Sequence, residues 1–138
     1  AIEQDDSWTE NPHNGDTCIR VCCGRSGEWM GVAWQRPAND WGYQPFGLDL
    51  SEAKKVTFWA RGERGGEKLK FRVGLLRENQ KYRDSMATRA QKITLTRKWK
   101  KYTIPLCGNK SFIKTGFVWS LDRSYEGLTF YLDDIFVE

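Results

Sequence analysis

The chain has 138 residues, of which 39% are hydrophobic and 29% are charged, and its formal net charge is +4. This length predicts a single domain over residues 1–138 with one hydrophobic core, and the composition is that of an ordinary globular protein. No apolar run approaches the roughly 20 residues that a membrane-spanning helix needs, so we expect no membrane association. The modest positive charge does not require an anionic partner.

Alternation of hydrophobic and polar residues predicts short β-strands throughout the chain, and no stretch keeps a helical period. The clearest case is residues 68–76, where apolar side chains fall on one face and basic side chains on the other. In chain order, the predicted strands are residues 17–24, 28–36, 55–61, 68–76, 93–96, 101–106, 113–121 and 128–137. Residues 1–13 are expected to form a peripheral segment. Short strands at this spacing indicate a β-sandwich or a barrel.

Two long segments, residues 36–50 and 77–91, show no regular period. The first contains prolines and glycines, and the second is polar. Long loops in compact domains are commonly functional or disordered, so both segments are candidates to carry binding residues.

The four cysteines, Cys18, Cys22, Cys23 and Cys107, lack the paired spacing of a zinc site, and His13 is the only histidine. The first three fall in one predicted strand, where they are badly placed to pair with one another. At most one ordinary disulfide is therefore expected, between Cys107 and one of the other three.

Several short segments, taken in order, resemble one family of domains. They are WMGVAWQ followed by PANDWG (29–35 and 37–42), LSEAKKVTFWARG (50–62), ITLT with WKKYTI (93–96 and 99–104), GFVW (116–119) and FYLDDI (130–135). The set is similar to the jelly-roll, galactose-binding-like domains that include many carbohydrate-binding modules of secreted glycoside hydrolases. The resemblance covers roughly residues 14–138. It implies an all-β fold, a jelly-roll β-sandwich of two antiparallel sheets, in which an outer face or a rim meets sugar.

The resemblance also implies a structural calcium ion. In many members an acidic residue of the last strand contributes to the metal site, and this chain has Asp133 and Asp134 there. Oxygen atoms of the N-terminal region complete such sites, where Asp5, Asp6 and Asp16 are available. We expect calcium to be held by Asp133, Asp16 and Asp5, since calcium prefers carboxylate oxygens.

Seven tryptophans in 138 residues favour sugar binding. A flat aromatic ring stacks on the apolar C–H face of a sugar, whose hydroxyl groups need directed hydrogen bonds. Trp34, Trp41 and Tyr43 lie at or just beyond a strand end, on a loop expected at the surface. They are predicted to form a sugar platform; the alternative is that they fold inward and close the end of the sandwich.

A second predicted platform is the strand face that carries Trp59 and Arg61. If the next strand lies beside it, Lys70 and Arg72 extend this face, and a basic aromatic face suits an acidic polysaccharide. Alternatively, the N-terminal segment covers Trp59. Asp84, in the second loop, is a candidate for accepting hydrogen bonds from sugar hydroxyls, or it is an ordinary solvated residue.

The sequence shows no recognisable catalytic set. Asp133 and Asp134 are adjacent in a strand and point to opposite faces, so they cannot flank one bond as a glycosidase pair does. The basic cluster at residues 97–101 is short, so no nucleic-acid partner is expected. We therefore predict a non-catalytic module, not an enzyme, that binds a polysaccharide or an oligosaccharide.

Two alternatives remain open. The first is a protein-interaction or structural β-sandwich domain of a larger extracytoplasmic complex, and the second is a polysaccharide lyase or hydrolase. We expect a monomer. The chain begins with Ala1 and shows no signal peptide, so the protein is expected to be processed and then secreted or periplasmic.

Overall fold

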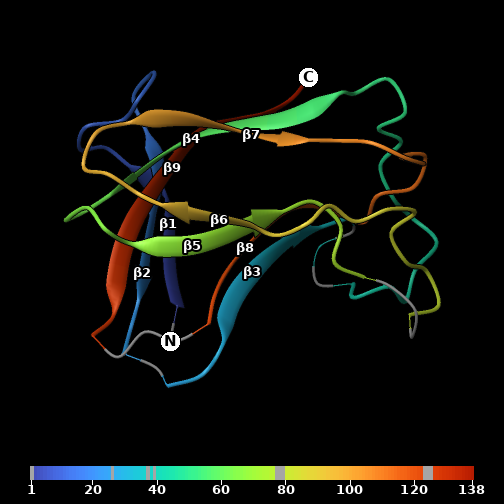
Figure 1. The fold of residues 1–138 in the computed structure, drawn as a ribbon, viewed down its shortest axis with the longest axis horizontal. Helices are drawn as coiled ribbons and strands as arrows, with labels where there is room; N and C mark the ends of the chain where they lie inside the picture. Colours follow the sequence, from blue (N-terminus) through green and yellow to red (C-terminus); the bar gives the residue numbers. More distant parts are fainter. Residues whose placement is uncertain (1, 26, 37, 39, 77–79, 123–125) are drawn as a thin grey trace.

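The computed structural model describes residues 2–25, 27–36, 38, 40–76, 80–122 and 126–138. Within these ranges the chain forms nine β-strands, and no helix there is long and apolar enough to cross a membrane. The strands are β1 (Ile2–Trp8), β2 (Cys18–Cys23), β3 (Met30–Gln35), β4 (Lys55–Gly62), β5 (Lys68–Arg72), β6 (Gln91–Thr94), β7 (Lys100–Pro105), β8 (Thr115–Leu121) and β9 (Leu128–Val137). They lie in two packed layers (Figure 1).

The two layers are antiparallel sheets. One has five strands in the order β1-β2-β9-β4-β7, and the other has four in the order β3-β8-β5-β6. The predicted all-β sandwich is therefore confirmed. Strand β1 was not predicted, because residues 3–7 between Ile2 and Trp8 are all polar and show no hydrophobic alternation.

The core is filled by aromatic side chains that alternate along the strands of both sheets. Phe58 and Phe130 come from the five-stranded sheet, and Phe71, Phe117 and Trp119 from the four-stranded sheet. The ring centres of Phe58 and Phe71 are 4.6 Å apart, and those of Trp119 and Phe130 are 5.0 Å apart. Each such pair contributes about 0.5–1.5 kcal/mol beyond the burial of its area, so these contacts hold the two sheets together.

The turn from β4 to β5 crosses from one sheet to the other. β4 pairs with β7 and β9, whereas β5 pairs with β6 and β8. Trp59 and Arg61 therefore lie on the outer face of the five-stranded sheet, and Lys70 and Arg72 lie on the outer face of the four-stranded sheet. The prediction that these side chains share one face is wrong, because the turn carries the chain across the sandwich and not to a neighbouring strand.

All four cysteines are free. Cys18 and Cys23 are buried, and Cys107 is exposed. Burial, with a smaller contribution from Cys22, raises the pKa of the Cys23 thiol to about 11. At neutral pH this thiol is therefore protonated and packs as a small apolar group.

Candidate functional site

An exposed indole ring lies on the outer face of the four-stranded sheet. Met30 and Val32 of β3 pack against the core, so Gly31 between them faces outward. The ring of Trp29 fills the space above Gly31, where a Cβ atom would lie 2.9 Å from its Cζ2 and Cη2 atoms. Because Trp29 is 58% exposed, this ring offers aromatic surface on the sheet.

Three more exposed rings lie on residues 40–46, which we call the aromatic loop. The exposed fractions are 45% for Trp41, 75% for Tyr43 and 57% for Phe46. The Trp41 N–H donates a hydrogen bond of 2.6 Å to Oε1 of Gln35, which fastens the loop to the end of β3. Trp41 has a φ of 53°, a left-handed conformation that costs a non-glycine residue on the order of 1 kcal/mol. The surrounding contacts therefore hold Trp41 in this position against local strain.

A buried ion pair lies under the aromatic loop. The Nζ atom of Lys114 is 2.7 Å from Oδ2 of Asp40, and both side chains are almost inaccessible to solvent. The same Nζ donates to the carbonyl oxygens of Arg36, Gln44 and Phe46. Every donor of the ammonium thus has a partner, as a buried charge requires, and the loop is wrapped around it.

The Asp40 carboxylate also accepts hydrogen bonds from backbone N–H groups of Gly42 and Gln44, at 3.0 and 2.8 Å. Burial disfavours its charged form, but Lys114 and these N–H groups outweigh burial and hold the pKa of Asp40 below its ordinary value. The Asp40 carboxyl group therefore stays ionised at neutral pH. It fixes the backbone from which Trp41 and Tyr43 project.

Asp84 belongs to the scaffold beneath this loop and not to the ligand surface. It is 1% exposed. Its Oδ1 accepts the N–H groups of Lys114 and Thr115, and its Oδ2 accepts those of Leu75 and Leu76 and the Thr115 hydroxyl. The prediction that Asp84 meets sugar hydroxyls is corrected, because its carboxylate satisfies backbone donors from two distant segments.

The predicted residues Trp34 and Arg72 occupy opposite sides of the four-stranded sheet. The Trp34 ring packs against Phe117, with ring centres 5.1 Å apart, and joins the core. Trp34 therefore follows the inward alternative and does not share a surface with Trp41. Arg72 faces outward and is half-buried, and its Nε donates to the carbonyl of Gly74 at 3.0 Å.

Trp59 and Arg61 lie in a packed cluster on the opposite face of the molecule. Trp59 stacks on His13 with ring centres 3.7 Å apart, so the alternative that the N-terminal segment covers Trp59 is confirmed. The guanidinium carbon of Arg61 lies 3.9 Å from the ring centre of Tyr131 and 5.4 Å from that of Trp99.

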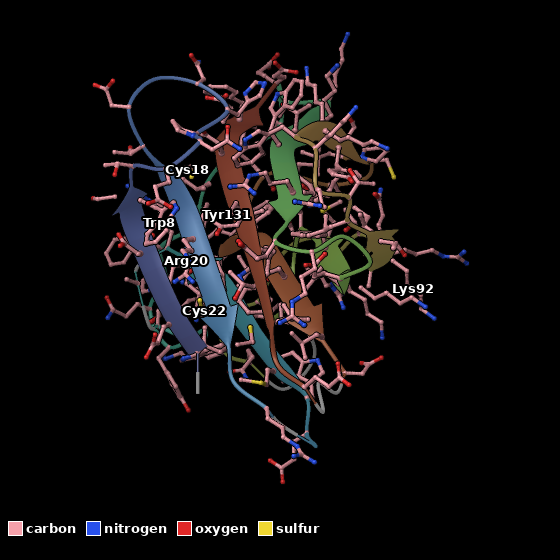
Figure 2. The ribbon with its side chains drawn as sticks, turned by 90° about the vertical axis from the view of Figure 1, so that its left-hand side faces the viewer. Trp8, Cys18, Arg20, Cys22, Lys92 and Tyr131 are labelled. Carbon is pink, nitrogen blue, oxygen red and sulfur yellow. The ribbon has the colours of Figure 1, made fainter. Side chains whose placement is uncertain are left out.

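The same cluster continues onto β1 and β2 (Figure 2). The guanidinium carbon of Arg20 lies 4.5 Å from the ring centre of Trp8, and Arg20 is the cross-strand partner of Tyr131. Tyr131 in turn donates a hydrogen bond to Glu63. Trp8, Trp59 and Trp99 are only partly exposed in this cluster, whereas Trp29, Trp41 and Tyr43 are more exposed. We therefore place the site on the four-stranded sheet.

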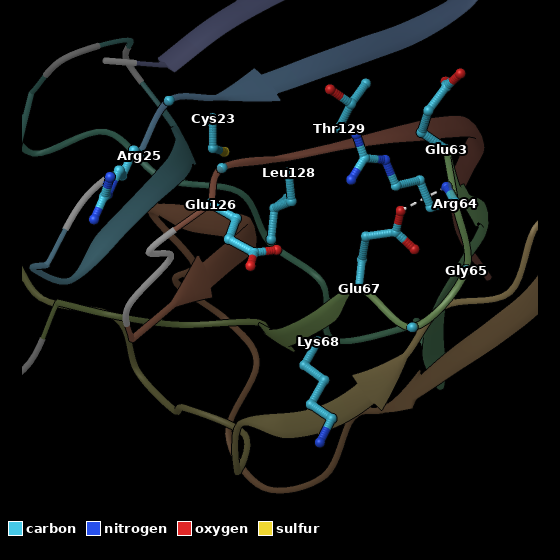
Figure 3. Close-up of a pocket in the computed structure, with 13 residues that line it drawn as sticks. Cys23, Arg25, Glu63, Arg64, Gly65, Glu67, Lys68, Glu126, Leu128 and Thr129 are labelled. Carbon is cyan, nitrogen blue, oxygen red and sulfur yellow. Dashed lines mark hydrogen bonds between the residues drawn. The ribbon is translucent and has the colours of Figure 1, made fainter.

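A hollow of about 710 Å³ lies at one end of the sandwich (Figure 3). Residues 23–25, 63–68 and 126–129 line it, and none of them is aromatic. The Glu67 carboxylate accepts the Arg64 N–H at 2.9 Å, while its Oε1 is buried against Gly62. The hollow therefore offers no ring for stacking, and its most buried carboxylate faces the protein.

Two of the three carboxylates predicted to bind calcium, those of Asp133 and Asp5, accept hydrogen bonds from the protein. Asp133 Oδ2 accepts the N–H groups of His13 and Asn14, at 3.0 and 3.1 Å. Asp5 accepts the N–H of Ser7, and Asp16 is exposed. Among the described residues, no group of three or more histidine, cysteine, aspartate or glutamate side chains is arranged to hold a metal. As placed, these carboxylates do not fit a calcium ion, and the ion stays a prediction.

Sequence reasoning did not find Trp29, Phe46, or the pair formed by Asp40 and Lys114. The sequence did contain a signal for Trp29. The outward-facing positions of β3 that follow it are the small residues Gly31 and Ala33, which leave room for a ring to lie on the sheet. For the ion pair no signal was available, since its two residues are far apart in the sequence and meet only in the folded chain.

Comparison with known proteins adds to this geometry. The family model described as carbohydrate binding domain 30 matches residues 3–137. A search of curated protein sequences found no match. Two of the similar solved structures are family 30 modules. One, from the cellulosomal cellulase Cel9D-Cel44B of Clostridium thermocellum, has 20% identity and a TM-score of 0.66 and covers 99% of this chain and 81% of that chain. The other has 21% identity and a TM-score of 0.63, and it covers 97% of this chain and 71% of that chain.

A third similar structure is the family 11 carbohydrate-binding module of Clostridium thermocellum, in complex with a β-1,3-1,4-mixed-linked tetrasaccharide. It has 13% identity and a TM-score of 0.63, and covers 99% of this chain and 82% of that chain. These likenesses show the fold. The family model, which spans nearly the whole chain, shows more: the chain belongs to the family of carbohydrate binding domain 30, and it is a non-catalytic carbohydrate-binding module.

Proposed function

We propose that this module binds an extended β-linked glucan chain on the outer face of the four-stranded sheet, between Trp29 and the aromatic loop. The observation that carries the proposal is the Trp29 ring, which lies over Gly31 and remains 58% exposed. The second ring, Trp41, is fastened to Gln35 at the other end of β3. Gly31 and Gln35 are four strand steps apart, about 13 Å, which leaves room for more than one sugar ring between the two platforms.

The choice of a glucan is supported by what similar proteins bind. The family 11 module was solved with a mixed-linked tetrasaccharide, and a family 30 module belongs to a cellulosomal cellulase. An affinity in the micromolar range or weaker is expected, because stacking on an open surface must offset the ordering of a flexible chain. We further propose, on the same likeness, a monomer that acts outside the cytoplasm, secreted or periplasmic.

The test is isothermal titration calorimetry with mixed-linked β-glucan oligosaccharides. Trp29→Ala and Trp41→Ala are each expected to weaken binding about tenfold or more, since removing a ring at the centre of an interface costs roughly 1–2 kcal/mol or more. The matched control is Phe136→Ala, because Phe136 is 55% exposed on the opposite sheet. If all three variants fold and bind like the wild type, the site does not lie on this face.

A further inference from the structure

The half of the four-stranded sheet that lies away from Trp29 is basic. Lys70 on β5 and Lys92 on β6 are cross-strand partners and both face outward, because Leu69 and Ile93 next to them pack into the core. Figure 2 shows Lys92 pointing into solvent, away from the strands that carry Trp8 and Arg20. Like charges directly opposite one another in a sheet are destabilising, so this pair favours a neighbouring anion.

One acidic side chain, that of Asp122, compensates part of this positive charge. A hollow of about 390 Å³ is lined by the charged residues Lys68, Lys70, Lys92 and Asp122, by Thr94 and Ser120, and by the apolar residues Leu69, Ile93 and Leu121. Asp122 forms an ion pair with Lys70, and the Lys70 Nζ atom lies 2.8 and 3.0 Å from the two carboxylate oxygens of Asp122. In the described part of the chain, neither Lys68 nor Lys92 has an ion-pair partner. Lys68 also borders the hollow at the end of the sandwich, where acidic side chains lie, and Lys92 acts on Asp122 only without a direct ion pair. With Arg72, four cations still face outward on these two strands against the single described carboxylate of Asp122 in this hollow.

This basic area is continuous with the Trp29 platform. Gly31, Ser120, Lys70 and Lys92 follow one another across the four strands as cross-strand partners. Neighbouring strands are about 4.8 Å apart, a spacing comparable with the length of one pyranose unit. A sugar chain that stacks on Trp29 and runs along β3 toward the aromatic loop therefore lies about two strand spacings, roughly 10 Å, from the β5 backbone that carries Lys70. Long lysine side chains, and substituents that the sugar rings direct toward β5, can bridge this gap.

We propose that the module prefers an acidic polysaccharide, with carboxylate groups on its sugar rings, over the corresponding neutral chain. The Lys68, Lys70 and Lys92 ammonium groups contact the carboxylates, while Trp29 stacks on a ring of the same chain. This inference rests on the proposed function, because it concerns the same face of the sheet. The hollow at the end of the sandwich does not share this character, since acidic and basic side chains are balanced there.

The test compares two ligands that share one backbone: β-1,4-glucan oligosaccharides and β-1,4-glucuronan oligosaccharides, in which each C6 hydroxymethyl group is a carboxylate. At low ionic strength we expect the wild type to bind the glucuronan about tenfold more tightly. In 1 M salt, where the screening length is about 3 Å, the two affinities should converge.

Lysine variants test whether the preference for glucuronan comes from this basic area. The double variant Lys68→Gln with Lys92→Gln is expected to lose the preference for glucuronan and to keep the affinity for glucan. The matched control is Lys101→Gln, an exposed lysine on the five-stranded sheet, which should keep the preference.

Three outcomes would overturn the inference. Equal affinities at low ionic strength refute the acidic preference and leave the proposed function standing. Failure of the folded wild type to bind either ligand refutes both. Binding of single-stranded DNA as tightly as glucuronan, with the same sensitivity to the lysine variants, would assign the basic area to nucleic acid instead.

Discussion

At the scale of single residues, Gly31 determines whether Trp29 can lie on the sheet. The glycine has no side chain, so the indole ring rests directly above the backbone of β3. A Cβ atom at this position would lie 2.9 Å from two atoms of the Trp29 ring and 2.8 Å from the carbonyl oxygen of Trp119. Real Cβ atoms do not approach other atoms this closely, so the ring must move when the glycine is replaced.

Gly31→Ala is therefore expected to displace Trp29 and to weaken glucan binding roughly tenfold, the same direction and size as Trp29→Ala. In the Trp29→Ala background, the second substitution should weaken binding by much less than tenfold, because the ring is already absent and only the contact with the Trp119 carbonyl oxygen remains. Calorimetric titration of the two single variants and the double variant measures this. Gly116→Ala serves as the control, because a Cβ there meets only Leu48, at an ordinary 3.7 Å. Full additivity would show that Gly31 acts independently of Trp29.

At the scale of elements, the aromatic loop is positioned by an ion pair, although it has no regular secondary structure. Asp40 and Lys114 bind each other and the backbone around them, so the loop has a defined shape before any ligand arrives. Pre-organisation of this kind lowers the entropy lost on binding. It also couples the ligand surface to the ionisation of Asp40.

The pH dependence of this element follows from the lowered pKa of Asp40. A carboxyl group whose pKa is lower in the folded state stabilises the fold above its unfolded pKa, about 3.9, and this contribution disappears as the pH falls through the lowered value. The difference in unfolding free energy between wild type and Asp40→Asn should thus be largest above about pH 4 and shrink toward zero below it. Urea unfolding at several pH values measures it. A difference that stays constant down to the lowest pH would contradict this account.

At the scale of the whole molecule, hydrophobic alternation predicted the strands from β2 onward and the class of fold, because burial of one strand face leaves a period of two in the sequence. It did not predict which sheet each strand joins. The glycine-containing turn after β4 has the sequence of a simple hairpin, yet it connects the two sheets. This is why Trp59 and Arg61 were grouped with Lys70 and Arg72.

The candidate site was only partly predictable for a similar reason. The exposure of Trp41 and Tyr43 was predicted correctly, because a loop rich in proline and glycine tends to lie at the surface. The prediction for Asp84 was wrong because its carboxylate accepts N–H groups of Leu76, eight residues earlier, and of Thr115, 31 residues later in the sequence. Contacts over such distances leave no local pattern to recognise.

The central claim is that the ligand binds the outer face of the four-stranded sheet. An NMR titration of ¹⁵N-labelled protein with a mixed-linked β-glucan oligosaccharide tests it most directly. The account predicts that the largest amide shifts fall on Gly31, Ser120 and the aromatic loop, while Arg20 and Tyr131 on the five-stranded sheet stay unchanged. Shifts concentrated on Arg20 and Tyr131, or on the residues 63–68 that line the end hollow, would contradict it.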